Sequence, residues 1–253
     1  MTVDAERQGN PGRRRFVRAG LTGAVAVTAG LVSATPVLPP DASVGLNGPR
    51  PHTPASALRA LATGNRRWRT LHERHPDETR AVRQTLVAGQ HPFAVILGCV
   101  DSRVPPELVF DQGLGDLLTV RSAGEVLDEA VLASIVYGVE ELRIPLVVIL
   151  GHQSCGAVAA AVHADETGGR LAGHMQYLAD QIRPAIDHSL TGAARVDAAI
   201  SANVGLVRTR LAAEPVLTAR IEARELAVVA ARYELTSQRV HQIAAAPPAT
   251  ARS

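Results

Sequence analysis

The chain contains no lysine, so all 26 of its basic residues are arginine. Aromatic residues make up only 3% of the 253-residue sequence, so aliphatic side chains must fill the hydrophobic core. The arginines are scattered and face 24 acidic residues, which leaves a net charge of +2. Because this charge is close to zero, the sequence offers no electrostatic basis for binding nucleic acid, and we expect no such partner.

Cysteine is scarce as well, with only Cys99 and Cys155 in the whole chain. In an exported protein, two cysteines on count alone favour one disulfide, which would indicate a redox or disulfide-stabilised protein. The length and the 46% hydrophobic content suit one sizeable core. After residue 34 no segment is long and apolar enough to span a membrane.

The first 34 residues have the three parts of a signal peptide. A basic cluster at residues 13–18 contains a twin arginine, and an uncharged stretch rich in Ala, Gly and Val follows to residue 34. This stretch ends in the small-x-small pattern Val32-Ser33-Ala34, which is typical of a cleavage site. We therefore predict export by the twin-arginine route to a secreted or cell-envelope location, with no stable membrane anchor after cleavage. An uncleaved anchor or a disordered basic tail is the alternative interpretation.

The rest of the chain divides by composition. Residues 35–53 contain five prolines and several glycines, which predicts a linker or an extended arm. A single folded domain is expected over residues 54–246, and a disordered tail over 247–253.

Short apolar runs alternate with helical patterns through the expected domain. Residues 93–97, 117–120, 146–150 and 226–231 are unbroken apolar runs typical of strands buried on both faces, and 239–243 resembles an edge strand. Helices are expected at 55–68, 77–88, 125–142 and 155–163, with two or three more before residue 222. This alternation predicts an α/β fold with a mostly parallel sheet of about four to five strands flanked by helices.

Three candidate metal ligands follow two of these strands. Cys99 follows the first strand after Gly98, and His152 follows the third after Gly151. Ligands collect at the carboxyl ends of parallel strands, so both side chains should reach one edge of the sheet. Cys155 lies three residues after His152, a spacing that places both on one face of a helical first turn.

Two thiolates and one imidazole form a donor set that suits Zn²⁺, and we predict one zinc ion per chain. Three protein ligands leave the fourth tetrahedral position open, as in catalytic zinc sites. Because the chain has no third cysteine, the fourth ligand must be water, a carboxylate or a second histidine.

A carboxylate and an arginine follow the first candidate ligand. Asp101 lies two residues after Cys99 and points the same way if the backbone there is extended. Arg103 lies two residues further on and can bind both oxygens of Asp101. The arginine then keeps the carboxylate ionised and oriented, so that it can accept a hydrogen bond from water on the metal.

These motifs resemble those of the β-class carbonic anhydrases. The family's Cys-x-Asp-x-Arg motif stands here at residues 99–103, and its His-x-x-Cys motif at 152–155. Residues 104–124 and 230–235 are also similar to the family, so the resemblance covers roughly residues 55–243. The sequence departs from the family at Glu125, where asparagine is usual, and at 236–238, where a Thr-Gly turn is usual.

The resemblance implies reversible hydration of carbon dioxide to bicarbonate, with zinc on Cys99, His152 and Cys155. It implies catalytic roles for Asp101 and Arg103, and we add Gly156 as a candidate substrate-binding residue. It also implies a homodimer or a multiple of dimers. Hydrolysis of carbonyl sulfide or carbon disulfide on the same zinc site, or a non-catalytic zinc-binding protein, are the alternative functions.

Overall fold

The computed structural model describes residues 50–244. The predicted signal peptide, most of the predicted linker and the predicted tail lie outside these residues. Arg50, near the end of the predicted linker, is held to the domain: its Nη1 donates to the carbonyls of His91 and Gly115, each at 2.7 Å. Within the described residues, no helix has both the length and the apolar character needed to cross a bilayer.

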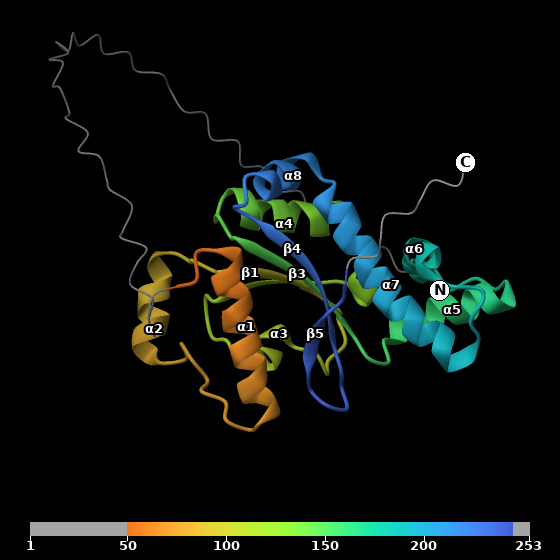
Figure 1. Cartoon of the computed structure of the whole chain (residues 1–253), viewed down its shortest axis with the longest axis horizontal. Coiled ribbons are helices and arrows are strands. Elements are labelled where there is room, and N and C mark those ends of the chain that lie inside the picture. The colour runs from red at the N-terminus through yellow and green to blue at the C-terminus, as the bar shows by residue number, and fades with distance from the viewer. Residues whose placement is uncertain (1–49, 245–253) are drawn as a thin grey trace, which may run out of the picture. The chain divides into compact units, whose positions relative to one another are not determined.

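A five-stranded sheet forms the centre of the domain, in the order β2-β1-β3-β4-β5 (Figure 1). The first four strands in this order run parallel, and β5 pairs antiparallel with β4 at the edge. The strands are β1 (Ala94–Gly98), β2 (Leu117–Arg121), β3 (Leu146–His152), β4 (Ala227–Tyr233) and β5 (Val240–Gln242).

Helices connect the strands and cover both faces of the sheet. The α-helices are α1 (Pro54–Arg69), α2 (Arg80–Thr85), α3 (Pro106–Val109), α4 (Glu129–Glu140), α5 (Gly156–Thr167), α6 (Met175–Ile182), α7 (Gly192–Ala212) and α8 (Pro215–Glu222). Three short 3-10 helices are η1 (Leu86–Ala88), η2 (Ala123–Glu125) and η3 (Arg183–Ala185).

Alternate residues of the central strands pack into two separate cores. Val95 and Leu97 of β1 face the core that also contains side chains of α4 and α8. Ala94 and Ile96 face the other core, which contains residues of α1, α3, α5 and α6. Helix α7 contributes to both cores. Because β1 and β3 are covered on both sides, their sequences are the unbroken apolar runs of a parallel sheet.

The predicted fold class is confirmed, with corrections at three elements. The run 117–120 is not buried on both faces: β2 lies at the edge of the sheet, where one neighbouring strand is missing, and its residues are half-exposed. The helix predicted from residue 125 begins only at Glu129, because Gly124 and Glu125 have left-handed φ angles of 64° and 52°. The helix predicted from residue 77 begins at Arg80, after the cap Thr79.

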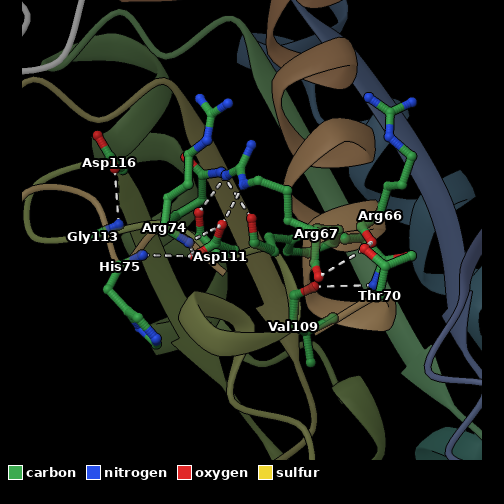
Figure 2. Close-up of polar contacts among 12 residues, drawn as sticks. Arg66, Arg67, Thr70, Arg74, His75, Val109, Asp111, Gly113 and Asp116 are labelled. Atoms are coloured by element: carbon green, nitrogen blue, oxygen red, sulfur yellow. Dashed lines mark hydrogen bonds and ion pairs between the residues drawn. The ribbon is translucent and has the colours of Figure 1, made fainter. Parts of the chain in front are cut away.

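A buried aspartate fixes the loop that leads to β2. Asp111 is 4% exposed, and its carboxylate accepts hydrogen bonds from the backbone amides of Arg74 and His75, each near 3.1 Å. It also pairs with the guanidinium of Arg67 on α1. Figure 2 shows these contacts converging from α1 and the following loop on one carboxylate. The strand that borders the site is thereby tied to the first helix.

Candidate metal centre

The sheet brings together the three residues that the sequence singled out as metal ligands. Strands β1 and β3 are neighbours, with Gly98 of β1 opposite Leu150 of β3. Cys99 follows β1 directly, and His152 is the last residue of β3. Both side chains therefore lie at the carboxyl edge of the sheet, as expected from the strand pattern.

The ligand atoms of Cys99, His152 and Cys155 all lie within 4.8 Å of one another, and all three residues are buried. The two sulfur atoms are 3.9 Å apart and both thiols are free, so no disulfide joins them. His152 is 0% exposed, and its Nδ1 lies 2.9 Å from the carbonyl of Gln153. Its Nε2 has no hydrogen-bond partner among the described residues.

The route by which Cys155 reaches the site differs from the prediction. His152 still belongs to β3, and Cys155 is the N-cap of α5, so the two do not share a helical turn. Ser154 between them has a left-handed φ of 56° and turns the chain back toward the strand. The tight turn therefore brings Cys155 close to His152, which a shared helix face was expected to do. It also leaves Cys155 at the positive end of the dipole of α5.

The paired thiols differ in acidity. A hydrogen bond from Cys155 lowers the pKa of Cys99, although burial opposes this change; His152 and the amide of Gly124 add to it. Donation of that same hydrogen bond, together with burial, raises the pKa of Cys155. Cys99 is thus the first to lose its proton, and a cation is needed to stabilise both thiolates at once.

Asp101 and Arg103 form the predicted pair beside these ligands. The Nε of Arg103 donates to Oδ1 of Asp101 at 2.9 Å, and its Nη2 donates to Oδ2 at 2.7 Å. The hydrogen bonds from Arg103 lower the pKa of Asp101 well below its ordinary range, so the carboxylate is ionised at neutral pH. Oδ2 of Asp101 lies 3.9 Å from Nε2 of His152. The backbone after Cys99 bends at Val100 and then turns, with the amide of Val104 donating to the carbonyl of Asp101 at 3.2 Å, so it is not an extended strand end.

Three residues that the sequence reasoning did not select hold the loops in place. Arg121, at the end of β2, donates to the carbonyls of Cys99 (2.8 Å) and Asp101 (2.7 Å). The amide of Gly124 lies 3.5 Å from the sulfur of Cys99, and Asn203 of α7 donates to the carbonyl of Gly124. Arg121 follows a strand at the same sheet edge, so the strand-end argument could have found it. Asn203 lies inside a long helix and gave no such signal.

Gly156 and the turn at 236–238, the other features that the sequence pointed to, have no assigned contact with substrate. Gly156 is the exposed first residue of α5, and a Cβ atom built there would meet no other atom within 4 Å. The unusual turn after β4 touches the site loop, because the amide and hydroxyl of Thr236 both donate to Oε1 of Gln153. This contact secures the residue that follows His152.

The donor set and its geometry fit a zinc ion. Sulfur and imidazole donors match this metal, and the unpartnered Nε2 of His152 is buried beside the two thiols, as a metal-binding nitrogen must be. The carbonyl at Nδ1 fixes the ring, a usual arrangement for a histidine ligand. Two cysteines and one histidine at the carboxyl edge of a parallel sheet thus form a candidate metal centre with three protein ligands.

The comparisons with known proteins agree with this class. Residues 94–240 match the family model described as carbonic anhydrase. Carbonic anhydrase 2 of Mycobacterium tuberculosis H37Rv is 42% identical over 188 residues, which cover 74% of this chain and 91% of that protein. The carbonic anhydrase of Mycolicibacterium smegmatis is 39% identical, with coverage of 74% and 92%. The chain belongs to the β-class carbonic anhydrase family.

Solved structures show the same fold. The β-carbonic anhydrase CafA of Aspergillus fumigatus is 28% identical with a TM-score of 0.62, covering 76% of this chain and 92% of that one. A β-carbonic anhydrase of Sordaria macrospora is 22% identical with a TM-score of 0.60, covering 74% and 96%. Strands β1 to β4 and the three candidate ligands lie within residues 94–240, the part of the chain that matches the family model.

Proposed function

We propose that Cys99, His152 and Cys155 hold one zinc ion, at which the chain hydrates carbon dioxide reversibly to bicarbonate and a proton. The observation that carries this proposal is the convergence of three buried ligand atoms within 4.8 Å, with Nε2 of His152 free of any other described partner. The family to which the chain belongs supports the same reaction.

The protein's own residues would shape the site around the metal. A zinc ion held by Cys99, His152 and Cys155 would supply Lewis acidity, which would make water a nucleophile near neutral pH. The positive end of α5 favours the thiolate of Cys155, and the amide of Gly124 favours that of Cys99. Because Cys99, His152 and Cys155 are all buried, bulk water has little access to their ligand atoms.

Asp101 is proposed to accept a hydrogen bond from the attacking water and to orient it. Its low pKa keeps it an acceptor, since a protonated carboxyl group would donate instead. Arg103 occupies both carboxylate oxygens and so holds the side chain in one rotamer. Because Arg103 occupies both oxygens of Asp101, this carboxylate is better placed to orient water than to bind the metal. Gly156 is proposed to leave room for substrate at the exposed start of α5.

Metal analysis together with stopped-flow carbon dioxide hydration tests the proposal. We expect about one zinc per chain in the wild type and loss of tight binding in Cys155→Ala and His152→Ala, because two ligands hold zinc poorly. His163→Ala, which changes an exposed histidine on α5, is the control and should keep both zinc and activity. Full zinc occupancy in Cys155→Ala would overturn the ligand assignment.

We propose that the chain assembles as a homodimer or a multiple of dimers. Strand β2 supports this, because it lies at the sheet edge with half-exposed residues that a second copy could cover. The Sordaria macrospora relatives are tetrameric. Sedimentation velocity at low micromolar concentration should give a mass of two or more chains, and an active monomer would contradict the proposal.

We also propose that residues 1–34 direct export by the twin-arginine route after the domain has folded. The two thiols lie 3.9 Å apart, so oxidation before metal loading would join them and destroy the site. Folding and metal loading in a reducing cytoplasm avoid this outcome. Replacing Arg13, Arg14 and Arg15 together with lysine should abolish export, and the exported protein should contain no disulfide. Export of the triple variant would contradict this route.

A further inference from the structure

A cavity lies at the end of the sheet opposite the metal centre. It has a volume of about 550 Å³ and borders the amino ends of β3 and β4. Six of its lining residues are polar: His52, Thr53, Arg143, Arg220, Arg224 and Glu225. Strand β3 begins beside this cavity and ends at His152. Its seven residues separate the cavity from the metal centre by about 20 Å, at ~3.3 Å per residue.

The charge around this cavity is strongly unbalanced. Three guanidinium groups line it, whereas Glu225 is its one carboxylate. Glu225 pairs with Arg220, whose Nε lies 3.1 Å from Oε2 of the glutamate. Within residues 50–244, neither Arg143 nor Arg224 has an ion-pair partner. The cavity therefore carries an excess of about two positive charges, and the N-terminal end of α1 at Pro54 adds a partial positive charge.

The backbone brings Arg143 and Arg224 to the same cavity. Each follows the end of a helix, α4 for Arg143 and α8 for Arg224, and each comes shortly before the next strand. Both have left-handed φ angles, 54° and 60°, which residues other than glycine seldom adopt. The amide of Ala227 donates to the carbonyl of Pro145 at 3.0 Å and so ties the two turns to each other. The arginines thus come from adjacent, hydrogen-bonded turns.

We propose that this cavity binds a small ligand that carries phosphate groups. A guanidinium presents two parallel N–H donors to a phosphate, and an excess of two positive charges suits a dianion better than a monoanion such as bicarbonate. A cavity of about 550 Å³ accommodates a ligand larger than one phosphate ion. The inferred site is separate from the metal centre and takes no part in the hydration reaction.

Isothermal titration calorimetry on the zinc-loaded protein tests the inference, with ionic strength held constant by sodium chloride. Inorganic phosphate, pyrophosphate and glycerol 3-phosphate are titrated separately, so that free phosphate is distinguished from a phosphate ester. We expect saturable binding of at least one of them at one site per chain. The variant Arg143→Gln/Arg224→Gln should weaken that binding by roughly tenfold or more. Arg170→Gln, at an exposed arginine on a remote loop, should leave it unchanged.

The hydration rate of the double variant checks its folding and its metal content, and it should equal that of the wild type. Because the metal centre is intact in this variant, binding of the same phosphate compound with undiminished affinity would place it outside this cavity and overturn the inference. Absence of saturable binding of all three compounds to the wild type would overturn it as well.

Discussion

Asp101→Asn separates the orienting role of this side chain from its role in folding. Asparagine has nearly the same size, and its oxygen can still accept hydrogen bonds from the backbone and Nε of Arg103, each at 2.9 Å in the wild type. Its amide nitrogen would instead face Nη2, which lies 2.7 Å from Oδ2 in the wild type, so two donors would meet there. The change removes a charge and one hydrogen bond but no packing.

The effect on stability should be small, because Arg103 is 53% exposed and solvent screens the pair. The effect on hydration should be large, on the order of 10²-fold, which corresponds to ~2.7 kcal/mol of transition-state stabilisation. The pKa of Asp101 lies far below neutrality, so the carboxylate does not titrate in the working range. The rate should therefore fall by a similar factor across neutral and alkaline pH.

Stopped-flow hydration, measured beside zinc content, provides the assay. Asp187→Asn is a matched control, since it makes the same substitution at an exposed aspartate in a distant loop, and it should retain full activity. Arg103→Ala should give a milder loss than Asp101→Asn, because it acts through the carboxylate. Full zinc content with activity within about twofold of wild type in Asp101→Asn would refute the orienting role.

Two further predictions concern stability. Gly64→Ala should cost about 1–3 kcal/mol in urea unfolding, because its Cβ would lie 1.6 Å from the carbonyl oxygen of Phe110; Gly205→Ala on α7, where a Cβ meets nothing within 4 Å, should be neutral or stabilising. Burial raises the pKa of Asp116 to about 6. Between about pH 4 and 6 the folded protein therefore keeps a proton on this group that the unfolded protein has released. The stability that the group contributes at low pH is thus lost as the pH rises from about 4 to 6. Unfolding of Asp116→Asn over this range should lack that contribution, and an identical pH dependence in the two proteins would contradict the assignment.

The sequence could predict that Cys99 and His152 lie close together, because the positions of these two residues depend on the sheet alone. Two unbroken apolar runs identified β1 and β3, and parallel strands end at a common edge, so Cys99 and His152 had to lie near each other once the strands were neighbours. Edge position was harder to infer: β2 has an apolar sequence much like that of β1, yet it is half-exposed. Local composition does not say how many neighbours a strand has.

The turns could not be predicted, because single left-handed residues determine them. Ser154 with a φ of 56° brings Cys155 to the site, and no propensity argument selects a serine for that conformation. Arg121 and Asn203 donate to backbone carbonyls of Cys99 and Gly124, and the directions of these carbonyls depend on the conformation of their own loops. Sequence spacing selected three residues whose ligand atoms lie within 4.8 Å of one another, although the turn that joins His152 to Cys155 differs from the one expected.

Glu125 shows how a departure from the family acquires a physical meaning only in the structure. Its side chain is 1% exposed, and its Oε1 has no hydrogen-bond partner among the described residues. Burial, and then the negative charge of Cys99, raise the pKa of its carboxyl group well above the ordinary value. Two thiolates already balance the charge of one divalent zinc ion, so a third negative charge there would be uncompensated. Burial therefore favours the protonated form of Glu125, which carries no charge, like the asparagine that the family pattern has at this position.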